Sequence, residues 1–438
     1  MKFPISLIAA AALLAGCGLF DNEKEETPTV GQRIPVLSSA EKLEVDPALA
    51  AVPVNIPPPE ANSSWPQPGG GAANSPGHLY LGQEIGQAWA ASIGEGASKR
   101  ARLAAGPVVA DGKVFTIDTQ ARVRAFDAAS GAMLWETQVG SEGENERALF
   151  GGGVAHADGR IFATNGVGHV AALDAATGGQ YWKVRPGGPL RGAPTIANNN
   201  VYVISQDNQL FALDPANGET RWNGLGALEI TGVFGSASPA AAQGTVVAGF
   251  SSGELTAYRY ENGRTVWQEV LSPTSISTSV ASLSDIDADP VIDAGRVYAI
   301  GQGGRMVALE LISGQRLWEL NIAGISTPAV AGDWLFVVTD EAKLLAIARE
   351  TGRIRWVTQL PRYRDEEDKK GPLSWVGPVL AGNRLVLANS RGALTAVSPF
   401  DGSIISTTEL GENVSLQPVI AGGHLYILTD SGRLLAWR

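Results

Sequence analysis

Short apolar runs alternate with turn residues along most of the chain, beginning near Trp89. The first complete unit has a Pro-led run at 107–110, further apolar runs at 114–117 and 123–127, and a last run that ends at Trp135. Gly, Asn and Asp stand between the runs, where turns need a positive φ. Apolar β-branched residues that alternate with polar ones are typical of short β-strands. We therefore predict four short strands joined by tight turns in each unit.

The unit repeats about every 45 residues, and its most regular part is an Asp, a Gly and a Trp spaced four residues apart. The clearest copies are Asp127, Gly131 and Trp135; Asp174, Gly178 and Trp182; and Asp214, Gly218 and Trp222. Later copies keep the Gly and the Trp at Gly263 and Trp267, Gly314 and Trp318, and Gly352 and Trp356, whereas Gly402 is followed by Ser406 at the Trp position. A four-stranded antiparallel sheet in a repeat of this length is the blade of a β-propeller.

Counting the units gives the number of blades. Seven complete units begin near Pro107, Val154, Pro194, Pro239, Pro290, Pro328 and Pro378. Three further strands follow them, and one unpaired strand around Trp89 precedes them. Joining these two remnants makes an eighth blade and leaves few exposed sheet edges. We predict an all-β, eight-bladed propeller with four-stranded antiparallel blades over residues 65–438, closed by the N-terminal strand.

The N-terminus has the pattern of a secretion signal. Lys2 precedes the apolar run Phe3–Leu14, which is far shorter than the roughly 20 residues that span a bilayer. Residues 14–17, Leu-Ala-Gly-Cys, resemble the lipobox of bacterial lipoproteins, so we expect a signal peptide at 1–16 and acyl chains on Cys17. The residue after Cys17 is Gly18 and not Asp, which by the same resemblance implies the periplasmic face of the outer membrane. Residues 17–64 are polar and Pro-rich and predict a flexible acidic tether. The apolar piece Ile34–Leu37 is also compatible with the alternative of a structured arm.

The composition excludes several classes of function. The chain has 33 Lys and Arg against 44 Asp and Glu, a net charge of -11, so it offers no basic surface for nucleic acid. One Cys in 438 residues excludes an internal disulfide, a CxxC zinc site and an iron–sulfur cluster.

The candidate metal ligands in the sequence do not have the spacing of known metal sites. The histidines His78, His156, His169 and His424 have no metal-ligand spacing, and we expect each at the surface or in a turn. Asp285, Asp287 and Asp289 begin like a calcium loop, but Pro290 and Arg296 stand where that loop needs Gly and Glu. We expect no metal and no cofactor.

Four connections are unusually long: 140–153, 223–238, 268–289 and 361–377. The second and third flank the fourth blade, so we expect them side by side on one face of the ring. They carry an apolar set beside carboxylates, namely Leu228, Ile230, Val233, Phe234 and Ile286 with Asp285 and Asp287. Such a patch is typical of a protein-docking surface, although ordinary loop residues would give the same pattern.

The Asp–Gly–Trp element resembles the tryptophan-docking repeat of quinoprotein-type eight-bladed propellers over residues 80–438. That resemblance implies that the tryptophans pack between blades and are structural. The repeat occurs in quinoprotein dehydrogenases and in the BamB family of outer-membrane lipoproteins. The dehydrogenases have an adjacent Cys pair, a calcium site and large insertions in the blades, and this chain has one Cys in a shorter sequence. We therefore expect no enzyme activity.

Two loop elements resemble the BamA-binding region of the BamB family. Leu228 and Ile230 match an apolar pair, and residues 283–287, Leu-Ser-Asp-Ile-Asp, match a second element that includes Asp285 and Asp287. The family's Arg is replaced by Thr231, which puts one charged contact in doubt. The resemblance implies a scaffold of the outer-membrane β-barrel assembly (BAM) complex that binds BamA, with unfolded barrel precursors as further partners through exposed strand edges. The alternative is a periplasmic quinone-binding or degenerate dehydrogenase lipoprotein, which copurifying proteins would distinguish.

Overall fold

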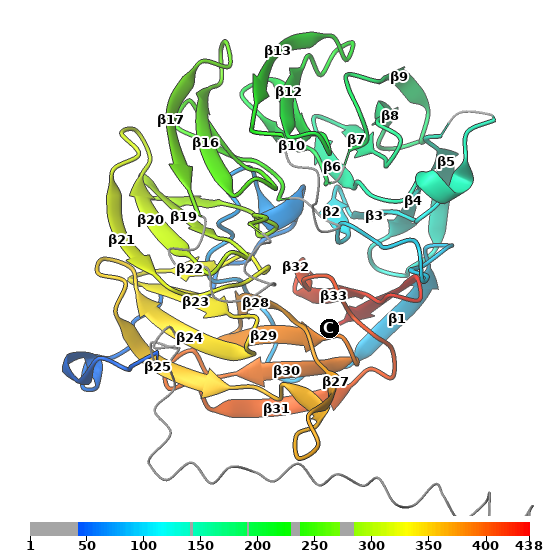
Figure 1. Cartoon of the computed structure of the whole chain (residues 1–438). Helices are drawn as coiled ribbons and strands as arrows, with labels where there is room; N and C mark the ends of the chain where they lie inside the picture. The colour runs from blue at the N-terminus through cyan, green and yellow to red at the C-terminus, as the bar shows by residue number, and fades with distance from the viewer. Residues whose placement is uncertain (1–42, 141–142, 191, 229–236, 272–283) are drawn as a thin grey trace, which may run out of the picture. The chain divides into compact units, whose positions relative to one another are not determined.

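Each sequence repeat folds into one four-stranded antiparallel sheet. The computed structural model describes residues 43–140, 143–190, 192–228, 237–271 and 284–438. Within these residues eight such sheets are arranged as blades around a central axis (Figure 1). The eight-bladed propeller predicted from the repeat is confirmed.

The first four blades follow one another in the chain. Blade 1 contains β2 (Val108–Ala110), β3 (Lys113–Ile117), β4 (Arg122–Asp127) and β5 (Met133–Gln138); blade 2 contains β6 (Val154–Ala157), β7 (Arg160–Thr164), β8 (Val170–Asp174) and β9 (Gln180–Val184). Blade 3 contains β10 (Thr195–Ala197), β11 (Asn200–Ile204), β12 (Gln209–Leu213) and β13 (Thr220–Leu225); blade 4 contains β14 (Ala240–Ala242), β15 (Thr245–Gly249), β16 (Glu254–Arg259) and β17 (Thr265–Val270).

The remaining blades complete the ring. Blade 5 contains β18 (Val291–Asp293), β19 (Arg296–Ile300), β20 (Met306–Glu310) and β21 (Arg316–Leu320); blade 6 contains β22 (Ala329–Ala331), β23 (Trp334–Val338), β24 (Lys343–Ala348) and β25 (Ile354–Gln359). Blade 7 contains β28 (Trp375–Ala381), β29 (Arg384–Asn389), β30 (Ala393–Val397) and β31 (Ile404–Glu409); blade 8 contains β32 (Val419–Ala421), β33 (His424–Leu428), β34 (Arg433–Trp437) and β1 (Gln87–Ser92). A hairpin of β26 (Tyr363–Asp365) and β27 (Lys370–Pro372) and the 3-10 turns η1 (Pro47–Leu49), η2 (Pro68–Gly70) and η3 (Glu146–Ala148) lie in the connections.

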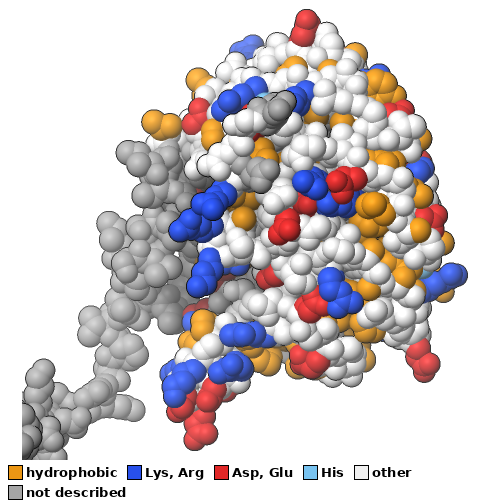
Figure 2. All heavy atoms as spheres, turned by 90° about the vertical axis from the view of Figure 1, so that its right-hand side faces the viewer, with side chains coloured by type: hydrophobic (Ala, Val, Ile, Leu, Met, Phe, Trp, Pro, Cys, Tyr) orange, Lys and Arg blue, Asp and Glu red, His pale blue; other side chains and the backbone are white. Residues whose placement is uncertain are grey.

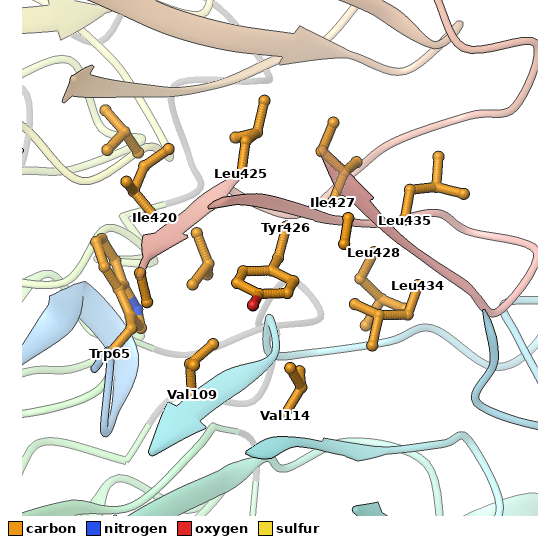
Figure 3. Close-up of a cluster of buried hydrophobic side chains, with 14 of the residues drawn as sticks. Trp65, Val109, Val114, Ile420, Leu425, Tyr426, Ile427, Leu428, Leu434 and Leu435 are labelled. Atoms are coloured by element: carbon orange, nitrogen blue, oxygen red, sulfur yellow. The ribbon is translucent and has the colours of Figure 1, made fainter. Parts of the chain in front are cut away.

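The N-terminal strand closes the ring. β1 pairs antiparallel with β34, with Ala90 opposite Leu435, and Figure 1 shows β1 beside the last strands and the C-terminus of the chain. The apolar side chains of blade 8 face those of blade 1, where Tyr426 points toward Val109 and Val114 (Figure 3). Burying apolar area contributes roughly 25 cal/mol per Å², so this joint is held by the same force as the other blade contacts.

Residues 60–79 form what we call the inner belt, which runs along the inner strands of the blades. Trp65 exchanges two backbone hydrogen bonds with Val109 of blade 1, at 2.7 and 2.9 Å. The belt also binds strands of six other blades, through Asn62 to Ile420, Pro66 to His156, Gln67 to Ile196, Ala72 to Ala241, Ala73 to Ile292 and Leu79 to Leu380. One segment therefore ties most of the ring together, and Figure 1 shows it in blue inside the blades.

Residues 43–59 also pack on the propeller, which differs from the flexible tether expected over 17–64. The Asp46 N–H donates to the Ile354 carbonyl at 2.9 Å, and Val54 is buried in the core shared by blades 6 and 7. Val54 and Ile56 pack in one cluster of blades 6 and 7, and Leu43 packs against the neighbouring cluster of blades 5 and 6. No described helix has the length and apolar character that would span a membrane.

Two of the histidines are buried, although His169 lies in the turn between β7 and β8, as a turn position was expected. His78 is 3% exposed: its Nδ1 lies 2.7 Å from the Pro57 carbonyl oxygen, and its Nε2 accepts the Asn383 N–H at 3.0 Å. His78 thereby fastens the end of the inner belt to blade 7. His169 is also buried, and burial lowers the pKa of its imidazole.

Candidate functional site

The two long connections around blade 4 leave from the same face of the ring. Leu225 at the end of β13 pairs with Gln209 at the start of β12, and Val270 at the end of β17 pairs with Glu254 at the start of β16. Each outer strand therefore ends beside the turn that joins the second and third strands of its blade. We call this side the loop face. The opposite face carries the turns that join the first strand to the second and the third strand to the fourth.

The first connection presents an exposed leucine. Leu228 is 75% exposed and Leu225 is 69% exposed. The residue before Leu228 is held at both backbone groups: the Ala227 N–H donates to Glu254 Oε2 at 2.5 Å, and its carbonyl accepts from Asn208 Nδ2 at 2.7 Å. Leu228 thus stands on a fixed base, as an interface anchor requires.

A glycine allows this loop to lie against blade 4. A Cβ on Gly226 would come within 2.8 Å of the Phe250 ring. The N–H of Gly226 donates to the Asn208 carbonyl at 2.8 Å. Any side chain at position 226 would therefore push this loop, and Leu228 with it, away from blade 4.

The second element lies against the same turn of blade 4. Ser284 Oγ donates to the Ser251 carbonyl at 3.2 Å, and the Ile286 N–H donates to the Phe250 carbonyl at 3.3 Å. Blade 4 thereby holds both connections through residues 250–254.

Blade 5 holds this element from its other side. The Gln302 N–H donates to the Asp285 carbonyl at 2.9 Å, and Gln302 Nε2 donates to Asp287 Oδ2 at 2.6 Å. Residues 284–287 are therefore fixed between two blades.

The residues expected to dock a partner differ in how far their side chains are exposed. Leu228 is exposed, but Asp285 and Ile286 are only 1% and 2% exposed, so neither presents its side chain to solvent as the sequence led us to expect. Ile286 is buried because Gly249 leaves room for it; a Cβ there would lie 2.6 Å from the Ile286 side chain. Asp287 is half-buried. Four of the residues singled out from the sequence, Ile230, Thr231, Val233 and Phe234, lie outside the described residues, as does Cys17.

This element also borders a cavity. This cavity of about 180 Å³ is lined by Asp287 and Asp289, with Trp65 and Gly69 of the belt region among its other lining residues. Asp289 was not singled out as a partner contact. Its carboxylate accepts the Ser238 N–H at 2.6 Å, yet burial raises its pKa to about 7.

The repeat tryptophans link neighbouring blades. Each indole N–H donates to a backbone carbonyl of the next blade: Trp89 to Ala128, Trp135 to Ala175, Trp182 to Pro215, Trp222 to Tyr260, Trp267 to Leu311, Trp318 to Arg349 and Trp356 to Pro399, at 2.7–3.3 Å. The ring of each packs against the glycine of that turn. At the joint of blades 7 and 8, Ser406 stands in place of the tryptophan.

Among the described residues, no three His, Cys, Asp or Glu side chains are grouped so that they could hold a metal ion. The side of the propeller drawn in Figure 2 carries Lys and Arg side chains interspersed with Asp and Glu. This face presents no continuous field of one sign.

Asn208, Ser251 and Glu254, which hold the two loops, were missed from the sequence. Polar residues in turns are common, so none of them stands out. One signal was present: Asn208 occupies a left-handed position, with φ 58°, where five other blades have glycine.

Sequence comparisons place these features among known proteins. A family model described as outer membrane protein assembly factor BamB matches residues 82–148, 120–358 and 364–437. BamB of Alkalilimnicola ehrlichii is 33% identical over 351 residues, covering 80% of this chain and 87% of that protein. BamB of Salmonella typhimurium is 27% identical over 390 residues, with the same coverage. The match to BamB of Moranella endobia is 25% identical over 243 residues, covering 56% of this chain and 60% of that protein.

Solved structures share the fold. The crystal structure of BamB from Moraxella catarrhalis has a TM-score of 0.68 at 20% identity, covering 81% of this chain and 100% of that chain. Quinohemoprotein alcohol dehydrogenase from Comamonas testosteroni has a TM-score of 0.64 at 15% identity, covering 86% and 80%. At these identities the likeness concerns the fold alone.

Proposed function

The chain belongs to the family of outer membrane protein assembly factor BamB, and on that premise we propose that it is a non-catalytic scaffold of the BAM complex. In this proposal it binds BamA through the loop face and assists the folding and insertion of outer-membrane proteins. Acyl chains on Cys17 hold it at the periplasmic face of the outer membrane. Two acyl chains suffice for stable anchoring without a membrane-spanning helix.

The observation that carries the proposal is the exposed Leu228 on a base fixed by two blades. An exposed apolar side chain with a rigid backbone loses little entropy on binding, so it serves as an anchor. Asp287, on the neighbouring element, is half-buried at the edge of a cavity and is the carboxylate we assign to the partner contact. Asp285 is buried, so we assign it the role of holding that element in place.

Ile230 and Thr231 complete the proposed contact set. They lie two and three residues after Leu228 in the sequence, and the family resemblance assigns the same stretch to BamA binding. Thr231 offers a hydroxyl in place of the family's guanidinium, so we expect it to contribute less than a charged contact would.

The test is a titration of the periplasmic domains of BamA against purified variants. Leu228→Ala should weaken binding about thirtyfold, since truncating an interface anchor costs on the order of 2 kcal/mol. The matched control is Leu134→Ala on the outer strand β5 of blade 1, where an exposed leucine lies on another part of the ring. Wild-type affinity in Leu228→Ala, with binding by the unmodified chain intact, would remove Leu228 from the site.

Asp285→Ala and Asp287→Ala divide the two carboxylate roles. Asp287→Ala should weaken binding and lower the unfolding temperature less than Asp285→Ala does, because its carboxylate is half-buried. Asp285→Ala should weaken binding and also lower the unfolding temperature, because a buried group that holds the element is lost. Equal affinities in all variants and in the unmodified chain would contradict this use of the second element.

A further inference from the structure

Two loops that are far apart in the sequence are linked through one buried side chain and the blade 4 turn that it contacts. We infer that Asn208 is a positioning residue that couples the Leu228 connection to the element at 284–287, so that both face a partner as one site. This inference rests on the proposed function, because it concerns the same surface. It adds a residue from blade 3 that contacts neither the partner nor the exposed leucine.

The Asn208 amide makes contacts in two directions. Its Nδ2 donates to the Ala227 carbonyl at 2.7 Å, directly before Leu228. Its Oδ1 accepts the Ser251 N–H at 3.2 Å and the Ser251 hydroxyl at 2.7 Å. Asn208 is 3% exposed, so water cannot replace these partners without rearrangement of the loop.

Ser251 continues the connection to the second element. Its carbonyl accepts Ser284 Oγ at 3.2 Å, and Ser284 precedes Asp285. The neighbouring Phe250 carbonyl accepts the Ile286 N–H at 3.3 Å. A displacement of the Ser251 turn therefore moves the acceptors of both Ser284 and Ile286.

The other blades do not carry this side-chain link at the same turn position. The equivalent left-handed residues are Ala121, Gly168, Gly253, Gly304, Ala342, Gly392 and Gly432, and none of these side chains can donate or accept a hydrogen bond. The backbone contact at this position recurs, because the carbonyls of Ala121, Gly253 and Gly392 also accept the N–H that follows their outer strand. Only the amide is specific to blade 3, next to the candidate site.

The glycines at the equivalent turns indicate a substitution that removes only the amide of Asn208. Glycine adopts the left-handed conformation freely and is native at five of the equivalent turns. Asn208→Gly should therefore keep the turn and its backbone hydrogen bonds while removing the amide. We expect the affinity for the periplasmic domains of BamA to fall about tenfold, a size usual for residues in one network.

The matched control is Asn199→Gly. Asn199 also has a left-handed backbone, with φ 56°, in the turn between β10 and β11 of the same blade, on the opposite face. It should bind BamA as the unmodified chain does. Similar unfolding temperatures for the two glycine variants would exclude a general loss of stability as the cause.

Coupling between the loops has its own readout. In Asn208→Gly, hydrogen exchange at the Ile286 amide should accelerate, although Asn208 does not touch that residue. In a double-mutant cycle, Asn208→Gly and Ser284→Ala should be non-additive in binding, whereas Asn199→Gly and Ser284→Ala should add. Unchanged Ile286 exchange together with additive effects would overturn the coupling.

The outcomes also separate this inference from the proposed function. If Leu228→Ala loses BamA binding and Asn208→Gly keeps it, the inference fails while the docking site stands. If the unmodified chain does not bind BamA, the proposed function fails, and accelerated Ile286 exchange in Asn208→Gly would still support the link between the loops.

Discussion

The indole N–H of Trp89 donates to the carbonyl oxygen of Ala128 at 3.1 Å, and this contact joins blade 8 to blade 1. Trp89 lies on the strand that comes first in the chain, whereas its blade is otherwise built from the last residues. The Trp89 ring also packs on Gly131, where a Cβ would come within 2.5 Å of it. The ring of blades is therefore closed by noncovalent contacts, made by a segment that is distant in sequence from the residues it contacts.

A chain that starts at residue 95 should lose much of its stability. It lacks β1 and the inner belt, which exposes the edge of β34 and removes hydrogen-bond partners of seven inner strands. We expect thermal unfolding at least roughly 10 °C lower, or no cooperative transition. A chain that starts at residue 43 keeps these contacts and is the control. Equal unfolding temperatures for the two truncated chains would contradict this role of the N-terminal segment.

The glycine under each tryptophan should be hard to replace. Gly263 has φ +69°, and a Cβ there would come within 2.5 Å of the Trp222 ring. Gly112 has nearly the same φ, +68°, with no neighbouring atom within 4 Å of its Cβ position. Gly112→Ala should therefore cost about 1–2 kcal/mol for its backbone alone, and Gly263→Ala about 1–3 kcal/mol more. Chemical denaturation measures both, and equal losses would show that the tryptophan contact is loose.

Asp289 should make stability depend on pH. Its pKa is raised to about 7 in the folded chain by burial, against about 3.9 in an unfolded chain. The favourable contribution of its protonated form is therefore complete below about pH 4 and is lost as the pH rises through 7. Asp289→Asn should be more stable than the unmodified chain at pH 8, by roughly 1 to 4 kcal/mol, and equally stable near pH 4.

The control for Asp289 is Glu261→Gln, at an exposed side chain. Removing an exposed charge usually changes stability by less than about 1 kcal/mol. If Asp289→Asn showed the same small difference at both pH values, the carboxylate would be better solvated than its surroundings indicate.

Cys17→Ser should release the protein from the outer membrane, provided that the signal peptide is still removed. The reason is that the proposed anchor consists of acyl chains on this one residue. Fractionation of cells that lack the BAM partners, after a high-salt wash, measures the anchor without protein contacts. Retention of the serine variant in the outer membrane under these conditions would contradict acyl anchoring.

The repeat by itself determined the number of blades, the order of their strands and the closure by the segment around Trp89. These features follow from local rules, since alternating apolar residues form strands and Gly, Asn and Asp form the turns between them. A unit that occurs seven times in full shows where each copy begins and ends, and an incomplete unit at each end of the repeat leaves one way to complete the ring.

Tertiary structure alone decided the inner belt and the form of the candidate site. The belt reaches seven different blades through isolated hydrogen bonds of its backbone and of two side chains, so it has no period that a sequence could display. Ile286 faces inward because Gly249 of the neighbouring blade leaves room for it. Asn208 matters because its buried amide meets Ala227 and Ser251 together. Such roles depend on contacts between residues far apart in the chain, and the local pattern around each residue does not contain them.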